Sequence, residues 1–433
     1  MGIDNFTKLV KKYAPEVIEI KEYQEFAGET WAIDGSIFFY RFAYDPQSKK
    51  TNPHIDGFYQ LIHRLYKNGI RPVIILDGKT PKQKLHTLEK RKQQKQKNIT
   101  KVSNLQDELV SMMGGVVINT STDQNIGHSQ QNLPCLSLEQ LVEMHKGHPL
   151  ELELKNKLEE VNKAKKNIIH FQPNTYLDIY TLCSLFCVPI LRANYEADAL
   201  CSKLYVDGKV DAIMSEDSDI LLYNGGRLIR KFNWSNKVEL IDLNKLLQKL
   251  QINYNQFIDL CILCGTDYTV ATIKGLGFIK AFELISKGLN IEAIIDNIQK
   301  AKISNDKSLN TYLKYYLPED LNDFDYKSAR DLIKEAHGLE NSEQIQPFNI
   351  DNIDFEQLKT LMVEKCKYQI QTVEKHKPSI VNGIILHNQP KKEKIKISLK
   401  MNSNKIQLKT LESVQNQNQN QTPQKIQLTL KLI

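Results

Sequence analysis

The chain has 433 residues, 41% of them hydrophobic, which is enough for a sizeable core in two or three domains or in one large domain with insertions. Its formal net charge is +7, and nine lysines and two glutamates between 378 and 433 account for the whole surplus. No apolar stretch approaches the roughly eighteen residues of a membrane span, and the seven cysteines lack disulfide-framework spacing. These features exclude a membrane protein and a disulfide-rich secreted domain, and they predict a soluble intracellular protein with reduced thiols.

Residues 1 to 97 contain alternating strand and helix patterns. WAID and RPVIILD read as strands, an apolar helix pattern covers Ile55 to Lys67 between them, and a long charged segment comes next. A similar alternation follows from about Thr175 to Ile285, within a second region that we delimit as 170 to 300. Such alternation predicts an α/β fold with a mostly parallel sheet and helices on both faces, where ligands bind beyond the carboxyl ends of the strands.

Three further regions complete the expected organisation. Residues 98 to 169 form an insertion whose middle, NTSTDQNIGHSQQNLP, lacks periodicity and is expected to be disordered, while LELELKNKLEEVNKAKK has helix-forming composition. Residues 301 to 377 are expected to be helical. Residues 378 to 433 form a basic, Asn- and Gln-rich tail with three related pieces, KIKISLK, KIQLKTL and KIQLTLKL. We expect this tail to be disordered; its alternation of lysine and apolar residues also fits a strand that forms on a partner.

Several carboxylates come directly after apolar runs, as in WAIDG, PVIILDG, AIMSEDSD and LCILCGTD. Buried elements that each end in an acid can bring the acids together, and the cluster repels itself unless divalent cations fill it. Because the ligands are oxygens only, Mg²⁺ or Mn²⁺ is the expected occupant. The candidate metal ligands are Asp34, Asp77, Glu196, Asp198, Asp217, Asp219 and Asp267.

The spacing of the paired acids predicts how they act. Glu196 and Asp198 stand at i, i+2 near the start of an expected helix, so one metal takes only one of them directly. Asp217 and Asp219 are expected on an extended segment, where i, i+2 places both on one face. The neighbouring Glu216 is more typical of a structural acid.

Two other motifs indicate contacts with phosphate. Eight Lys or Arg side chains against one acid lie after Asp77 between Lys79 and Lys97, either as a solvated helix face or as cations for a phosphodiester. In IKGLGFIKAFELI, Gly275 and Gly277 form a tight turn before an apolar-periodic helix, where backbone N–H groups can approach phosphate, helped by Lys274 and Lys280. The lone CxxC of Cys261 and Cys264 is more typical of core packing than of a zinc site.

Taken in order, the motifs resemble those of the flap endonuclease family of structure-specific 5′ nucleases, which includes exonuclease 1 and the xeroderma pigmentosum group G nuclease. The matching pieces are MGIDNFTKLV, AIDGS, GIRPVIILDGKTP, YEADA, AIMSEDSDIL and CILCGTDYTVATIKGLGFIKA. The resemblance implies a PIN-like 5′ nuclease fold with a helical arch and a helix-turn-helix DNA-binding element. It also implies a Mg²⁺-dependent phosphodiesterase that acts on branched or 5′-ended DNA in replication or repair, in the nucleus.

Residue by residue, the resemblance gives the seven acids to two metal ions, with Asp34, Asp77, Glu196 and Asp198 at the first. Lys84 and Arg91 match arch residues that contact the scissile phosphate, Tyr40 matches an aromatic that stacks on the nucleotide beside the cut, and Gly2 matches a residue near the substrate junction. The turn of Lys274, Gly275, Gly277 and Lys280 matches the element that grips duplex DNA and can hold K⁺.

Some alternatives stay open at this point. The spacer from Asp77 to Glu196 is longer than in typical flap endonucleases, and a 5′→3′ exonuclease or a non-catalytic DNA-binding scaffold of the same fold are alternatives. The tail also fits a recruitment module. It has no clear sliding-clamp peptide, since Gln427, Leu430 and Ile433 match that pattern poorly. We expect a monomer.

Overall fold

The computed structural model describes residues 3, 5–43, 51–112, 143, 146, 151–165, 173–232, 235–304, 306–340, 345 and 352–389, together with the backbone of 397–402 and 405–410. By contacts the chain forms two units, residues 1–389 and 390–433. None of the helices in the described ranges combines the length and the hydropathy that crossing a bilayer requires.

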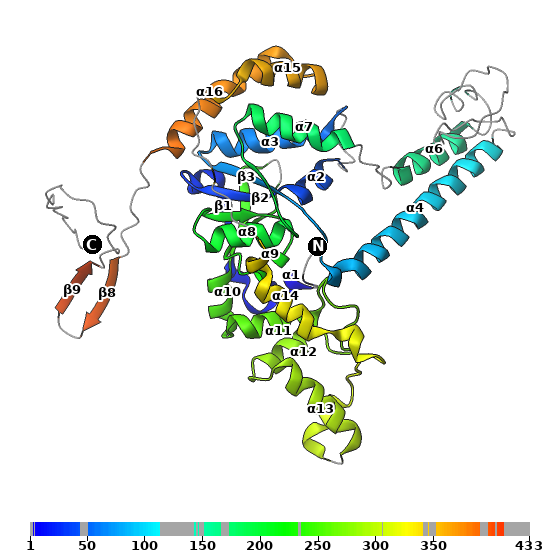
Figure 1. Cartoon of the computed structure of the whole chain (residues 1–433), viewed down its shortest axis with the longest axis vertical. Coiled ribbons are helices and arrows are strands. Elements are labelled where there is room, and N and C mark those ends of the chain that lie inside the picture. Colours follow the sequence, from blue (N-terminus) through cyan, green and yellow to red (C-terminus); the bar gives the residue numbers. More distant parts are fainter. Residues whose placement is uncertain are drawn as a thin grey trace. The chain divides into compact units, whose positions relative to one another are not determined.

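A seven-stranded sheet forms the centre of the first unit (Figure 1). Its strand order is β1-β7-β6-β5-β2-β3-β4. The five strands from β6 to β4 pair in parallel, and β7 and β1 add antiparallel pairs at one edge, which confirms the expected mostly parallel sheet. The strands are β1 (Ile18–Glu22), β2 (Thr30–Asp34), β3 (Arg71–Leu76), β4 (Ile190–Arg192), β5 (Ala212–Met214), β6 (Arg227–Arg230) and β7 (Lys237–Asp242).

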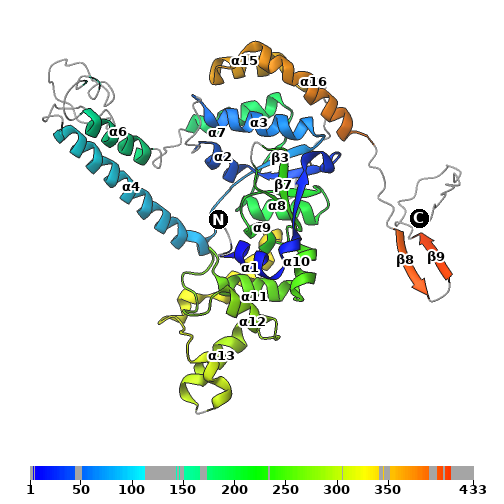
Figure 2. The same ribbon diagram turned by 180° about the vertical axis from the view of Figure 1, so that it is seen from behind.

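Both faces of the sheet are covered by helices, as Figures 1 and 2 show. Successive side chains of a strand point to opposite faces, so Ala32 and Ile213 join one apolar core while Ile33 and Met214 join the other. The first core packs against α1, α8, α10, α11 and α14, and the second against α2, α3, α7, α15 and α16. These strands are apolar throughout because a parallel sheet buries both of its faces.

The helices with described bounds in the first unit are α1 (Phe6–Tyr13), α2 (Gly35–Ala43), α3 (Pro53–Lys67), α4 (Leu85–Met112), α6 (Glu151–Lys165), α7 (Pro173–Leu185), α8 (Ala197–Val206), α9 (Asp219–Leu222), α10 (Leu243–Leu250), α11 (Tyr254–Cys264), α12 (Phe278–Ile285), α13 (Ile291–Ile303), α14 (Tyr326–Leu339), α15 (Phe355–Cys366) and α16 (Ile370–His387). Short 3₁₀ turns cover η1 (Pro15–Val17), η2 (Tyr23–Phe26), η3 (Lys82–Lys84), η4 (Lys307–Tyr312) and η5 (Leu321–Phe324).

The insertion begins inside a long helix. α4 continues across the boundary that we expected at 97 and 98, because Val102, Leu105 and Leu109 repeat at helical spacing and give the helix an apolar side. That side packs on α6, with Leu105 and Leu109 against Leu154 and Val161. The helix expected from LELELKNKLEEVNKAKK is thus confirmed as α6, whereas the polar segment 119–134 lies outside the described residues.

The C-terminal part differs from the expectation at two points. α16 continues through Pro378, where we expected the tail to begin, because the helix packs closely on α3 on both sides of that residue. In the second unit, where we expected disorder, Ile397–Asn402 (β8) pairs with Lys405–Thr410 (β9) in an antiparallel hairpin. These strands fall in the first two of the three related pieces, whose alternation suits a strand. The third piece, 425–432, lies outside the described residues.

Candidate active site

Two acids lie side by side at the carboxyl edge of the sheet. Asp34 is the last residue of β2, and Asp77 comes directly after its parallel neighbour β3. The Asp34 carboxylate accepts hydrogen bonds from the Ile37 N–H (3.1 Å) and the Ser215 hydroxyl (2.8 Å). Asp77 Oδ1 accepts the Ala197 N–H at 2.9 Å, so this carboxylate lies at the positive N-terminal end of α8.

The second pair of acids is on α8, at the place that the sequence predicted. Glu196 is the N-cap residue of this helix and Asp198 lies in its first turn. Glu196 Oε2 accepts hydrogen bonds from two tyrosine hydroxyls, Tyr268 at 2.7 Å and Tyr223 at 3.1 Å. Asp198 Oδ1 is buried without a hydrogen-bond partner.

The third pair is arranged differently from the expectation. β5 ends at Met214, and Asp219 is already the first residue of α9, so Asp217 and Asp219 are not on an extended segment. A turn replaces the strand because Asp217 Oδ1 accepts the Asp219 N–H at 3.0 Å. Asp219 is 1% exposed, and both of its carboxylate oxygens lack a partner. Glu216 is structural, as expected: its carboxylate accepts the N–H groups of Lys231 and Phe232.

The acids share one electrostatic environment. Burial raises the pKa of Asp34 to about 7, with Asp77 as the next cause. Burial also raises the pKa of Asp198 well above its usual range, with Asp34 and Asp217 adding to the shift. The pKa of Asp219 rises because of burial and then because of the charges of Asp217, Asp267 and Glu196. The interactions that raise these pKa values thus join all seven predicted metal ligands, which come from distant parts of the chain.

Two cations from the base of the arch compensate part of this charge. Lys84 Nζ lies 2.7 Å from Glu196 Oε1 and 4.7 Å from the centre of the Tyr268 ring. Burial alone would lower the pKa of Lys84, but the charges of Glu196, Asp219 and Asp198 outweigh burial and raise it. Arg91, two turns further along, pairs with Asp267 at 3.1 Å. The two predicted phosphate-binding cations therefore both contact predicted metal ligands.

The donor set fits a divalent cation of the Mg²⁺ type. Every candidate ligand is a carboxylate, and three buried oxygens, on Asp198 and Asp219, have no hydrogen-bond partner, although a buried carboxylate oxygen normally needs one. Among the described residues, however, no three His, Cys, Asp or Glu side chains are already arranged as a metal-binding group. The acids are thus electrostatic neighbours without a ready coordination sphere among the described side chains. Cys261 is a buried core residue, as expected.

The described residues among the predicted DNA contacts come from α2 and from the turn that leads into α12. Tyr40 is 45% exposed near the end of α2, and Gly2 lies outside the described residues. Gly275 has φ +87°, and an added Cβ would lie 2.8 Å from the Lys314 carbonyl oxygen, so the turn requires glycine there. Gly277 is the N-cap of α12 and has open space beside it. Lys280 pairs with Glu283 at 2.8 Å.

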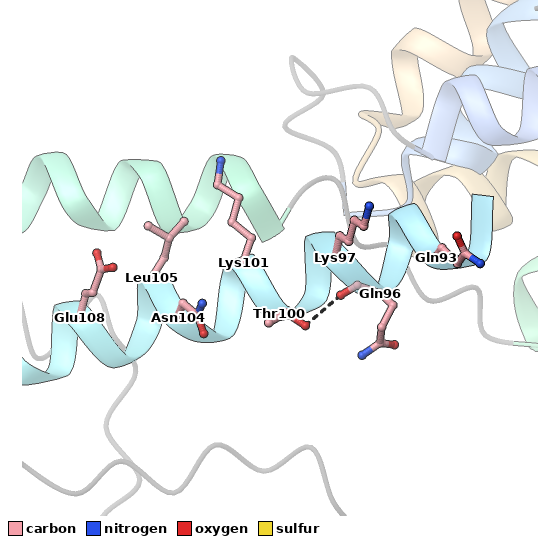
Figure 3. A pocket seen from close by; sticks show the side chains of 8 residues that line it. All are labelled: Gln93, Gln96, Lys97, Thr100, Lys101, Asn104, Leu105 and Glu108. Carbon is pink, nitrogen blue, oxygen red and sulfur yellow. Dashed lines mark hydrogen bonds between the residues drawn. The ribbon is translucent and has the colours of Figure 1, made fainter. Parts of the chain in front are cut away.

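The arch helix carries a surface hollow of about 720 Å³ (Figure 3). One face of α4 lines it, at helical spacing, with Gln93, Gln96, Lys97, Thr100, Lys101, Asn104, Leu105 and Glu108. The Thr100 hydroxyl donates to the Gln96 carbonyl oxygen at 3.1 Å, so it is satisfied within the helix. None of the seven acids lines this hollow, which therefore offers amide and ammonium groups along the arch and not a second acidic site.

Both segments of the chain that carry the seven acids match models of one protein family. The model of the XPG N-terminal domain matches residues 1–98, and that of the XPG I-region matches 187–267. Flap endonuclease 1 of Brugia malayi is 30% identical over 348 residues, which cover 77% of this chain and 75% of that protein. Flap endonuclease 1 of Drosophila yakuba is 31% identical over 369 residues, 82% of this chain and 76% of that protein.

The chain belongs to the flap endonuclease and XPG family of structure-specific 5′ nucleases. It is therefore a nuclease. Solved structures confirm the fold: the catalytic core of Rad2 in complex with DNA substrate aligns with a TM-score of 0.61 at 20% identity, covering 88% of this chain and 100% of that one. Human GEN1 in complex with Holliday junction DNA aligns with a TM-score of 0.55 at 13% identity, covering 94% and 86%.

Family motifs did not indicate several side chains that shape the pocket of this nuclease. Ser36, Ser215, Tyr223 and Tyr268 hold acids or their backbone, and each lies inside or just beyond a recognised motif. Glu340 lies in none of these motifs, so the sequence gives no indication of its role. Its carboxylate accepts the N–H groups of Asn194 (2.7 Å) and Tyr195 (2.9 Å), so the end of α14 fixes the loop that leads to Glu196.

Proposed function

We propose that this family member is a Mg²⁺-dependent structure-specific 5′ nuclease, a flap endonuclease or 5′→3′ exonuclease that hydrolyses phosphodiester bonds of branched or 5′-ended DNA. The observation that carries the proposal is the group of seven acids whose charges interact, with three buried carboxylate oxygens on Asp198 and Asp219 that have no partner. When bound, two divalent ions would supply an activated water and neutralise charge at the phosphate.

Each side chain of the pocket has a task in this proposal. Asp34, Asp77, Glu196 and Asp198 would hold the first ion, and Asp217, Asp219 and Asp267 the second. Lys84 and Arg91 already lie at the acids, so a scissile phosphate that enters the pocket meets two cations from the base of the arch. Mn²⁺ is a chemically equivalent occupant for an all-oxygen site.

Recognition of the DNA would use its shape and its backbone. The exposed Tyr40 ring can stack on the nucleotide beside the cut, and the 274–280 turn can grip the duplex, with K⁺ as a candidate ligand of that turn. The Rad2 and GEN1 structures are complexes with DNA, which supports DNA as the partner. Relatives named flap endonuclease 1 support a role in DNA replication or repair and hence in the nucleus. We propose that it acts as a monomer without direct recruitment by a sliding clamp.

The test is incision of labelled flap, nick, bubble and four-way substrates with Mg²⁺. Asp217→Ala should lose incision by at least about a thousandfold while DNA binding persists, because an acid does not attract a polyanion. Glu335→Ala, an exposed acid on α14 outside the pocket, is the matched control and should cut like the wild type. Incision by a clean Asp217→Ala preparation, or binding without cutting by the wild type, would overturn the proposal. The second outcome would favour a non-catalytic DNA-binding protein.

A further inference from the structure

The hydroxyls of two buried tyrosines meet at one oxygen of Glu196. Tyr223 is 1% exposed and Tyr268 is 3% exposed. Both hydroxyls lie within hydrogen-bond distance of Glu196 Oε2, at 3.1 Å and 2.7 Å, and they also contact each other. From this geometry we propose that Tyr223 and Tyr268 are positioning residues, which orient the Glu196 carboxylate for the divalent cation; this inference rests on the proposed function.

The count of protons supports a fixed orientation. Two phenols carry two protons and a carboxylate carries none, and among the described residues the acceptors that these two hydroxyls contact are Glu196 and each other. A buried phenol without a partner is destabilising, and so the carboxylate and the two hydroxyls stabilise one another. With Oε2 held in this way, the carboxylate group can no longer rotate freely.

The other oxygen of Glu196 already contacts a cation. Oε1 contacts the Lys84 ammonium at 2.7 Å, and this ammonium also lies over the face of the Tyr268 ring. Oε1 can therefore bind a cation while Oε2 keeps its hydrogen bonds with the two tyrosines. If Lys84 turns to a phosphate, Oε1 is the oxygen that becomes available to a metal ion.

The pair also connects three of the acid-bearing segments. Tyr223 is the C-cap of α9, whose first residue is Asp219, and Tyr268 comes directly after Asp267. Glu196 begins α8. The hydrogen bonds among these three side chains hold the start of α8, the end of α9 and the segment after α11 at a fixed separation, which a metal site assembled from all three requires.

The experiment measures binding of Mn²⁺ alone to the full chain, without DNA, by electron paramagnetic resonance. Tyr223→Phe and Tyr268→Phe keep both rings, and so the packing, but remove the donors. Each should weaken Mn²⁺ binding by about 10-fold, and the double variant by more. The matched control is Tyr254→Phe, which removes a partly buried hydroxyl that donates to the Leu222 carbonyl oxygen and makes no hydrogen bond to an acid among the described residues. It should bind Mn²⁺ like the wild type.

A Mg²⁺ titration of incision is the second readout. Excess Mg²⁺ should restore kcat in Tyr223→Phe and Tyr268→Phe, because their defect is in the affinity for the ion; a folding defect would not be rescued. Wild-type Mn²⁺ affinity in both single variants and in the double variant would overturn this inference and leave the proposed function intact. A wild type that neither binds Mn²⁺ nor cuts DNA would overturn the proposed function itself.

Discussion

The imidazole rings of His63 on α3 and His376 on α16 stack with their centres 3.9 Å apart and an interplanar angle of 19°. His63 Nε2 lies 2.9 Å from the Ser379 hydroxyl, and His376 Nδ1 lies 2.8 Å from the Tyr59 hydroxyl. Burial lowers the pKa of His63 to about 3, with further contributions from His376 and from Lys67 and Arg64 on its own helix. The pKa of His376 is lowered by burial and by Lys67.

This pair should make the first unit sensitive to acid. Because both pKa values are lower in the fold than the ordinary 6.5, the stability contributed by the neutral rings is present above that value and is lost as the pH falls below it. The melting temperature should therefore fall between pH 7 and pH 5, and the fall should be smaller in His63→Gln. Calorimetry at matched ionic strength measures this, with His86→Gln on α4 as control. An equal fall in His63→Gln and wild type would contradict the assignment.

Gly78→Ala should destabilise the fold and slow incision. An added Cβ would lie 2.0 Å from the Ala193 carbonyl oxygen, in a place where the Gly78 N–H donates to the Tyr195 carbonyl oxygen at 2.8 Å. The loop after β3 and the loop before Glu196 would have to separate, at a cost of about 1–3 kcal/mol. Denaturant unfolding measures this cost. The matched control is Gly338→Ala on α14, where nothing lies within 4 Å and where alanine should stabilise the helix by about 0.5–1 kcal/mol.

Arg330 is expected to hold three helices together. Its guanidinium binds Asp259 on α11 at 2.9 Å and both carboxylate oxygens of Glu292 on α13 at 2.8 and 3.2 Å. Since Asp259 is 6% exposed, Arg330→Met would leave a buried unpaired charge and cost about 3–5 kcal/mol. Lys300→Met, which breaks an exposed pair with Asp296, should cost less than about 1 kcal/mol. Equal unfolding free energies for the two variants would show that the Arg330 network adds nothing.

Divalent cations should stabilise the protein more at alkaline than at acid pH. Burial and mutual repulsion raise the pKa values of Asp34, Asp198 and Asp219, so in the folded state these groups bind protons that the unfolded chain has already lost. Their contribution to stability therefore falls as the pH rises through the raised values, about 7 for Asp34. Ca²⁺ can replace the lost protons only where the acids are ionised.

The measurement is the difference in melting temperature with Ca²⁺ and with a chelator, at pH 8 and at pH 5.5. The difference should be larger at pH 8 and should shrink in Asp219→Asn. Taking the difference at each pH cancels titration elsewhere, including that of the histidine pair. The same difference at both pH values would argue against a cation at these acids.

The sequence was informative where function depends on local pattern. Asp34 and Asp77 could be placed because an acid at the end of a parallel strand has one possible location, and Glu196 because YEADA starts a helix. The extended segment predicted for Asp217 and Asp219 is wrong, because β5 has three residues and no sequence pattern marks its end at Met214. The contact of Glu340 with Asn194 spans 146 positions, and no spacing rule reaches that far. The boundary expected at Pro378 is wrong for another reason. Packing of α16 on α3 outweighs the helix-breaking tendency of proline, so the helix continues through this residue.

Gly383 on α16 bears on how this enzyme can be shortened. An added Cβ would lie 1.7 Å from the Tyr66 carbonyl oxygen, so the two helices touch through their backbones. The two matched family models end at residues 98 and 267, which invites a minimal fragment that ends soon after α14. Such a fragment lacks α15 and α16, so Tyr59 and its aromatic neighbours on α3 would become exposed to solvent. An exposed apolar patch of this kind would make the fragment prone to aggregate. A trimmed version that stays monodisperse should retain everything up to residue 389 and discard only residues 390–433.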